Sequence, residues 1–230
     1  MIKAIVFDLD NTLVDFMRMK EEAVKSAIEA MIDAGLNMTK EEAYERIFEI
    51  YNREGIEDQQ VFNKFLQENF GYIDYRILAA GIVGYRRAKE AALVLYPHVQ
   101  YTLMQLLKRG LRLAVVSDAP RLQAWTRLAQ VGLHHFFEVV VAYEDTGERK
   151  PSPKPFLFTL ERLGLEPGET MMVGDWAERD ITGADKIGMV TVFAKYGDTF
   201  GTVNSGADYE IDDIIDLLEI VYKLNQNTGK

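Results

Sequence analysis

The 230-residue chain contains no cysteine. This absence excludes a disulfide framework, a thiolate metal site and a thiol nucleophile, and it is compatible with a reducing intracellular setting. Long apolar runs are also missing, since no segment reaches the ~18 apolar residues of a membrane span. The N-terminus lacks the basic flank and apolar stretch of a secretory signal. We therefore predict a cytoplasmic protein that does not enter the membrane.

Basic residues are too few to favour a polyanionic partner. The chain has 26 lysines and arginines against 36 aspartates and glutamates, so its formal net charge is -10. A protein that binds nucleic acid or an anionic membrane surface needs a basic surplus to replace the counterions of its partner. The sequence thus predicts that neither nucleic acid nor a membrane is a partner.

Low-complexity sequence is confined to the polar tail NQNTGK, and no internal repeat is present. Hydrophobic residues make up 48% of the chain and charged residues 27%. This composition is enough for a sizeable buried core and argues against a disordered protein. The length fits one large domain or a domain that carries a substantial insertion.

Short apolar runs, bounded by polar or turn residues, recur along the chain. A continuous apolar run, rather than an alternating one, is typical of a strand buried on both faces of a parallel sheet. The runs cover residues 2–7, 111–116, 137–142, 170–173, 190–194 and, more weakly, 209–211. We predict a strand at each of these positions.

Segments with apolar residues at helical spacing lie between the predicted strands. They cover residues 99–107, 122–129, 156–163 and 177–187, and each is soon followed by a glycine, as helix ends commonly are. The alternation of strand and helix is typical of a doubly wound parallel α/β sheet with a Rossmann-like core.

One long segment interrupts this alternation. From about Arg18 to Val94 the sequence shows only helical patterns, including Thr39 and Glu42 at the positions of a capping box. Such a segment is too long for a crossover between two strands and is typical of an inserted domain. We predict a catalytic core of residues 1–15 and 95–230 and an all-helical cap domain of residues 16–94.

Polar residues follow the predicted strands where a parallel sheet binds its ligands. Asp8 follows the first strand, Ser117 the second and Asp175 the fourth, while Lys150 lies in the loop after the third. Asp180 comes five residues after Asp175. Open parallel sheets bind ligands outside the carboxyl ends of their strands, near the point where the strand order reverses. We therefore expect these side chains to meet in one site.

The sequence DLDNT places Asp8 and Asp10 close together directly after a buried strand. Like charges at such short range raise each other's pKa unless a cation or a proton lies between them. Carboxylates gathered beside a phosphate-sized space are a usual way to hold Mg²⁺, which prefers hard oxygen ligands. We predict Mg²⁺ as the cofactor, held by Asp8, Asp10 and Asp175, with Asp180 nearby.

Four segments together resemble the ordered signatures of the haloacid dehalogenase-like (HAD) superfamily of hydrolases. They are DLDNT, Ser117 after an apolar strand, RKPSP around Lys150, and VGDWAERD. The resemblance extends over residues 1–14 and 95–218, and the helical segment lies where that family carries its cap. Each signature alone is weak, but four in order, each at a strand end, are specific.

The resemblance implies a role for each acidic residue. Asp8 is expected to attack phosphorus and form an aspartyl-phosphate. Asp10 is expected to protonate the leaving alcohol and then to activate water, while its backbone carbonyl helps to hold the metal. The side chains of Asp8 and Asp175 are the other implied metal ligands. Asp180 is expected to support these ligands without binding the metal directly, or to act through a metal-bound water.

The resemblance also implies roles in substrate binding. Ser117 is expected to donate a hydrogen bond to the phosphoryl oxygens, and Lys150 to neutralise charge on the phosphoryl group and on Asp8. Thr12 and the backbone amides near Leu9 and Asp118 are expected to steady the surrounding loops.

Basic residues near the start of the predicted cap are a separate prediction. Arg18 and Lys20 are expected to attract an anionic substrate, and their removal should raise the KM. The chain also departs from the family pattern at two positions. Trp176 stands where a small polar residue is more common, and His98 where a glycine is expected. Trp176 could narrow the pocket or pack against the core, and we favour packing against the core.

The sequence therefore predicts a Mg²⁺-dependent phosphatase, a phosphoric monoester hydrolase that acts on a small phosphorylated metabolite of the sugar or triose phosphate type. A phosphomutase of the same family keeps the same residues and stays open, as does a metal-binding protein without hydrolase activity. A receiver-type signalling domain also carries a phospho-aspartate, but it has no use for the helical insertion. The oligomeric state is left open between monomer and homodimer.

Overall fold

The computed structural model describes residues 1–226, and the chain divides into two compact units. Met1–Asp15 and Val94–Lys230 form the first, here called the core unit, and Phe16–Leu93 form the second, the helical unit. No helix among the described residues is long and apolar enough to cross a membrane.

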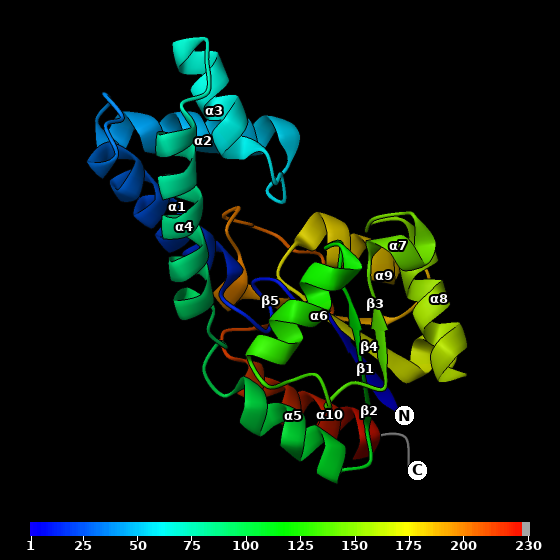
Figure 1. The fold of residues 1–230 in the computed structure, drawn as a ribbon. Helices are drawn as coiled ribbons and strands as arrows, with labels where there is room; N and C mark the ends of the chain where they lie inside the picture. The colour runs from blue at the N-terminus through cyan, green and yellow to red at the C-terminus, as the bar shows by residue number, and fades with distance from the viewer. Residues whose placement is uncertain (227–230) are drawn as a thin grey trace. The chain divides into compact units, whose positions relative to one another are not determined.

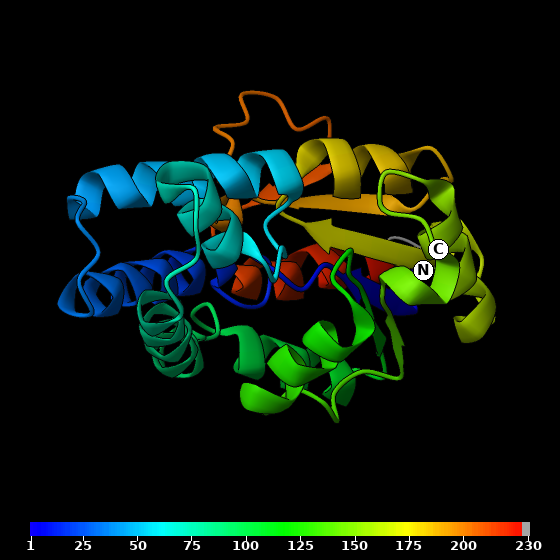
Figure 2. The same cartoon turned by 45° about the horizontal axis from the view of Figure 1, so that its top comes forward.

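The core unit is built on a six-stranded parallel sheet in the order β3-β2-β1-β4-β5-β6. In Figure 2 the arrows of β4 and β5, in yellow and orange, point the same way. The predicted doubly wound parallel sheet is therefore confirmed. The strands are β1 (Ala4–Phe7), β2 (Arg112–Val116), β3 (Val139–Val141), β4 (Thr170–Gly174), β5 (Val190–Ala194) and β6 (Tyr209–Ile211).

The apolar runs of the sequence account for the strands. Every residue of β1, with the sequence AIVF, is buried, because helices cover both faces of the sheet. The outer strands β3 and β6 have three residues each and are only partly buried, as expected at the edges of a sheet.

Helices cover the two faces of this sheet. Phe156 and Leu163 of α8, with Ala184 of α9, pack against Val6 and Met172 on one face. Helices α5 and α10 pack against each other, and Figure 1 shows them on the side of the strands away from α8 and α9. The helices are α5 (Val99–Lys108), α6 (Arg121–Gln130), α7 (Tyr143–Thr146), α8 (Pro153–Leu163), α9 (Thr182–Asp185) and α10 (Leu217–Gln226).

The strand register brings the ends of three strands level. Phe7, the last residue of β1, pairs with Val115 of β2 and Val173 of β4. The residues that follow each strand therefore emerge at the same edge of the sheet. The strand order reverses between β1 and β4, which is where doubly wound sheets bind their ligands.

The chain leaves and re-enters the core unit through two adjacent segments. Val14 pairs with Leu95 in an antiparallel bridge, and the Asp15 N–H donates to the Val94 carbonyl at 3.0 Å. The Tyr96 N–H donates to the Leu13 carbonyl at 3.1 Å. The two points of connection are thus held together by the core unit's own hydrogen bonds.

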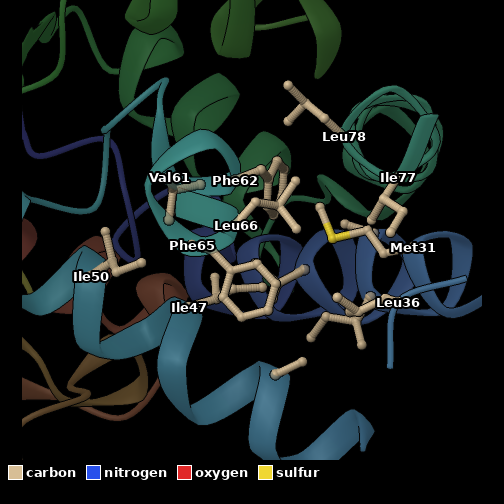
Figure 3. Close-up of a cluster of buried hydrophobic side chains, with 14 of the residues drawn as sticks. Met31, Leu36, Ile47, Ile50, Val61, Phe62, Phe65, Leu66, Ile77 and Leu78 are labelled. Carbon is tan, nitrogen blue, oxygen red and sulfur yellow. The ribbon is translucent and has the colours of Figure 1, made fainter. Parts of the chain in front are cut away.

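The helical unit contains four helices: α1 (Phe16–Asp33), α2 (Lys40–Glu54), α3 (Val61–Phe70) and α4 (Tyr75–Ala92). As predicted, Thr39 caps α2 by accepting from the Glu42 N–H at 3.2 Å. All four helices contribute to one hydrophobic cluster, and its labelled side chains point toward one another (Figure 3). They are Met31, Leu36, Ile47, Ile50, Val61, Phe62, Phe65, Leu66, Ile77 and Leu78.

The segment after β4 differs from its prediction. Instead of one helix over residues 177–187, the structure has a π-helical turn at Ala177–Ile181 followed by the short α9. The wide turn lets the Asp180 carboxylate fold back and accept a hydrogen bond from the Trp176 N–H at 3.0 Å. π-turns of this kind are frequent at functional sites.

Candidate active site

Asp8 is the first residue beyond β1. Its backbone N–H donates to the Val173 carbonyl of β4 at 2.9 Å, which continues the sheet pairing by one residue and fixes the direction of the side chain. The residue is only 7% exposed. Its carboxylate receives a hydrogen bond from the Lys150 ammonium, which comes from a segment 142 residues away in the sequence.

Two further carboxylates lie beside Asp8. One oxygen each of Asp8, Asp175 and Asp180 lies within 4.8 Å of the others, and all three residues are buried. Gly174 makes room for this cluster, because a Cβ at that position would lie 2.3 Å from an Asp180 oxygen. The three acidic residues that the sequence placed after the first and fourth strands are therefore neighbours in space.

Lys150 holds the cluster from the side of β2. Its ammonium lies 2.6 Å from an Asp180 oxygen and donates to the Asp8 carboxylate and, at 3.2 Å, to the Val116 carbonyl. The residue is 4% exposed. A buried ammonium with several acceptors has one orientation, so the lysine stabilises the arrangement of the carboxylates around it.

The electrostatics of the cluster are those of crowded, desolvated carboxylates. Burial raises the pKa of Asp8 to about 8; Lys150 opposes the rise, and the neighbouring carboxylates add to it. Burial, and after it the charge of Asp8 and Asp180, raises the pKa of Asp175 well above its usual value. For the Lys150 ammonium, burial alone lowers the pKa, but the Asp180 and Asp8 carboxylates outweigh it and leave the pKa above its usual value.

The donor set fits a hard divalent cation. Three carboxylates face one ammonium, so the fully ionised cluster carries an excess of two negative charges. Buried charges of one sign require a counter-charge or protonation. Hard oxygen donors without sulfur or imidazole are the set that suits Mg²⁺, Ca²⁺ and Mn²⁺. The acidic triad is therefore consistent with Mg²⁺ binding.

Asp10 points to a different partner. Its Oδ2 accepts a hydrogen bond from Nη1 of Arg127, on α6, at 2.6 Å. Arg127 was not among the residues predicted from the sequence. A signal was present, because this arginine stands beside Ala124 and Leu128 in the buried stripe of the helix, where a charged residue is unexpected.

The loop after β2 contributes Ser117 and Asp118. Ser117 is buried at the strand end, and its Oγ accepts from the Ala119 N–H at 3.1 Å. Asp118 accepts from the Lys150 backbone N–H at 2.9 Å and from the Arg179 guanidinium at 3.1 Å. Its carboxylate thus connects the loops that follow three different strands. Arg179 is a second residue of the site that the sequence patterns do not predict.

Trp176 differs from its expected place in the core. It is partly exposed, with its ring 4.2 Å from that of Phe200 and the Arg179 guanidinium 3.7 Å above it. The ring is thus packed between an aromatic side chain and a cation rather than among aliphatic residues. A cation over the face of tryptophan is a favourable contact that leaves the ring edge near water.

Thr12 and Leu9 support the loop after β1. The Thr12 hydroxyl donates to an Asp175 oxygen at 2.9 Å, and its carbonyl accepts from the Tyr196 hydroxyl at 2.8 Å. Leu9 is fully buried, and its carbonyl closes the turn. Gly197 passes so close that a Cβ there would lie 1.7 Å from the Asn11 carbonyl oxygen.

The two basic residues predicted for substrate attraction lie in the helical unit, on α1. Arg18 is exposed, whereas Lys20 is only 3% exposed. The Lys20 ammonium donates to the Tyr85 hydroxyl at 3.0 Å and lies 4.2 Å from the centre of the Tyr51 ring. Lys20 is therefore part of an aromatic cluster and not a freely hydrated cation. The role of Arg18 stays a prediction.

Comparison with known proteins adds an independent result. The sequence profile of the haloacid dehalogenase-like hydrolases matches residues 2–188. A glyceraldehyde 3-phosphate phosphatase from Methanopyrus kandleri is 39% identical over 97% of this chain and 99% of its own length. One from Methanocaldococcus jannaschii is 37% identical over 99% of this chain and all of its own. The crystal structure of a HAD phosphatase from Thermococcus onnurineus superimposes with a TM-score of 0.71 at 31% identity, covering 96% of this chain and 98% of that one.

Proposed function

Because this chain belongs to the haloacid dehalogenase-like hydrolases, we propose that Asp8, Asp10, Ser117 and Lys150 hydrolyse a phosphomonoester. The family assignment that the four sequence signatures indicated is confirmed. The chain is a phosphatase of this family. The observation that carries the assignment of residues is the buried cluster of Asp8, Asp175 and Asp180 around the Lys150 ammonium.

In the first step an oxygen of Asp8 attacks phosphorus. The new bond joins that oxygen to phosphorus while the ester bond to the leaving oxygen breaks. Asp10 gives its proton to the leaving oxygen, so the product departs as a neutral alcohol. The products of this step are the alcohol and an aspartyl-phosphate on Asp8.

In the second step water replaces the carboxylate of Asp8. Asp10, now ionised, takes a proton from the water molecule. The water oxygen bonds to phosphorus, and the bond between phosphorus and Asp8 breaks. Inorganic phosphate leaves, and both aspartates return to their starting states. Lys150 neutralises charge on the phosphoryl group in both steps, and Ser117 donates to its oxygens.

The carboxylates of Asp8 and Asp175 and the backbone carbonyl of Asp10 are the groups that we propose to hold Mg²⁺. Asp180 already contacts Lys150 with one oxygen and the Trp176 N–H with the other, which favours a supporting role over direct ligation. When bound, the ion supplies Lewis-acid polarisation of the phosphoryl oxygens.

We propose different roles for the core unit and the helical unit. All of these residues lie in the core unit, so we propose residues 1–15 and 95–230 as the catalytic domain. Residues 16–94 are then the cap domain, which carries Arg18 and limits which phosphate esters are accepted. This division keeps the predicted boundaries, which differ from the two compact units only at Val94.

The substrate that we propose is glyceraldehyde 3-phosphate or a closely related small phosphate ester. Several full-length relatives, at 34–39% identity, are described as glyceraldehyde 3-phosphate phosphatases. The cytoplasmic location and the choice between monomer and homodimer stay predictions from the sequence.

The proposal is tested by phosphate release from a panel of phosphomonoesters that includes glyceraldehyde 3-phosphate. We expect turnover with Mg²⁺ and none with EDTA. Asp8→Asn should lower kcat by about six orders of magnitude, because an amide oxygen is a poor nucleophile, and a loss of this size follows the removal of the nucleophile of a serine protease.

Asp185→Asn is the matched control. Asp185 is exposed on α9 and lies outside the site, so the same change there should leave turnover at the native level. Turnover that persists in Asp8→Asn, or in EDTA, would contradict the mechanism. Formation of an isomeric phosphate ester in place of free phosphate would identify a phosphomutase.

A further inference from the structure

Arg127 is a buried arginine in a helix that contributes no other residue to the site. Its side chain is 3% exposed, and the residue lies 117 positions away from Asp10 in the sequence. The neighbouring residues of its stripe, Ala124 and Leu128, are fully buried apolar residues. An aliphatic side chain would continue this stripe without the cost of removing a guanidinium from water.

The contact with Asp10 is short and directional. Nη1 donates to Oδ2 at 2.6 Å, a distance typical of a strong charge-assisted hydrogen bond. The Asp10 side chain as a whole is 23% exposed, whereas that of Arg127 is 3% exposed. The arginine therefore holds Oδ2 of Asp10 from within the buried stripe of α6.

We infer that Arg127 is a positioning residue that fixes the Asp10 carboxyl for proton transfer to the leaving group. Lys150 and Asp175 act on other groups, because Lys150 donates to the Asp8 carboxylate and Asp175 accepts from the Thr12 hydroxyl. A planar guanidinium holds a carboxylate at a defined angle, which the single ammonium of a lysine does less well. The inference rests on the proposed role of Asp10 as general acid.

Two substrates with different leaving groups can distinguish a role of Arg127 in positioning Asp10 from a role in general structural support. An alkyl phosphate such as glyceraldehyde 3-phosphate needs a proton on its leaving oxygen, whereas 4-nitrophenyl phosphate releases a stable phenolate that does not. The value of kcat/KM reports the steps up to the departure of the leaving group. A defect in the orientation of Asp10 must therefore lower kcat/KM for the alkyl ester selectively.

The experiment measures kcat/KM of the Mg²⁺-loaded full chain with both substrates. We expect Arg127→Met to lower the value for the alkyl ester about 10- to 100-fold, the size expected for a misplaced catalytic group. The value for 4-nitrophenyl phosphate should stay close to native. Arg127→Lys keeps the positive charge but lacks the planar guanidinium, so it should recover part of the loss. It replaces Arg127→Met as the test variant if Arg127→Met fails to fold.

A double variant shows whether the arginine acts through Asp10. In the Asp10→Asn background, adding Arg127→Met should cause no further loss with the alkyl ester, because the group that it orients is already gone. Arg112→Met is the control, since it removes another arginine–carboxylate pair, with Glu138, at the opposite end of β2. It should leave both substrates unaffected.

Three outcomes would overturn the inference: equal losses for both substrates in Arg127→Met, full activity of that variant with the alkyl ester, or additive losses in the double variant. A different result concerns the proposed function itself. If Asp10→Asn alone leaves turnover of the alkyl ester unchanged, the assignment of Asp10 as general acid fails, whatever Arg127 does.

Discussion

At the residue scale, a single hydroxyl connects the loop after β1 to the acidic cluster. Thr12 donates to an Asp175 oxygen at 2.9 Å and is fully buried, while Tyr196 holds the Thr12 carbonyl from the other side. Groups that orient metal ligands in this way contribute to metal affinity without touching the metal. The chain Tyr196–Thr12–Asp175 is thus expected to matter for Mg²⁺ more than for catalysis by the loaded enzyme.

Thr12→Val removes this hydroxyl while keeping the shape of the side chain. We expect the apparent Kd for Mg²⁺ to rise about 10-fold, because Asp175 loses a hydrogen bond to its charged form. At saturating Mg²⁺ the kcat should return to near the native value. Calorimetric titration of Mg²⁺ and activity against Mg²⁺ concentration measure both quantities.

Thr126→Val is the matched control, because the Thr126 hydroxyl donates only to the Leu122 carbonyl on the exposed part of α6. Its Mg²⁺ affinity should equal that of the native protein. An unchanged Kd in Thr12→Val would show that the hydrogen bond to Asp175 does not support the metal site.

The sequence located the strand-end residues but not the residues that hold them. Asp8, Ser117 and Asp175 follow buried apolar runs, and the rule for parallel sheets places such residues at one edge. Arg127 comes from a helix face and Tyr196 from the loop after β5. Their positions depend on how a helix is rotated and how a loop folds, which strand patterns do not encode.

At the scale of elements, α1 and α4 approach each other closely in the helical unit. Gly84 of α4 makes this possible, because a Cβ there would lie 2.6 Å from the Ser26 carbonyl oxygen and 3.0 Å from the Ala30 Cβ. The Ser26 hydroxyl also donates to the Gly84 carbonyl at 3.2 Å. The pairing of these two helices is therefore specific to a glycine at this position.

Gly84→Ala is expected to destabilise the helical unit. The added methyl group meets backbone atoms that cannot rotate away, and overpacking of this kind costs about 1–3 kcal/mol, which exceeds the gain in helix propensity. Urea denaturation followed by circular dichroism measures the change. Gly168→Ala serves as the control, since a Cβ at Gly168 meets no atom within 4 Å. Equal stability of the two variants would contradict the close-packing argument.

The sequence predicted the elements more reliably than their internal geometry. The continuous apolar runs placed all six strands, and Thr39 marked the start of α2 as expected. The stretch of residues 177–187 shows the limit. Its apolar spacing predicts a helix, but the structure has a π-helical turn at Ala177–Ile181, where the Asp180 side chain accepts from the Trp176 N–H.

At the scale of the whole molecule, the acidic cluster connects folding stability to pH and to divalent cations. The pKa of Asp8 is raised to about 8 by burial, whereas in the unfolded chain it returns to its usual value near 4. Between these values the folded state binds a proton that the unfolded state has released. The contribution of Asp8 to stability is therefore full below about pH 4 and is lost as the pH rises toward 8.

Without metal, we expect the native protein to lose stability relative to Asp8→Asn as the pH rises from 5.5 to 8. In the proposed site Mg²⁺ is held by ionised carboxylates that only the folded state brings together, so it should stabilise the protein more at pH 8 than at pH 5.5. At 100 times its Kd the gain is about 2.7 kcal/mol. Urea denaturation at both pH values, with EDTA or Mg²⁺, provides the test, and Asp8→Asn should respond less to both variables.

The hydrogen-bonded pair of segments at Asp15 and Val94 has a consequence for the history of such proteins. Because the core unit closes its own backbone where the helical unit begins and ends, a short turn suffices to join the two segments. We therefore expect the core unit to keep its fold when another insert replaces the helical unit. If the helical unit selects the substrate as proposed, exchange of the helices between residues 16 and 93 should change the accepted phosphate esters and leave the proposed reacting groups in place.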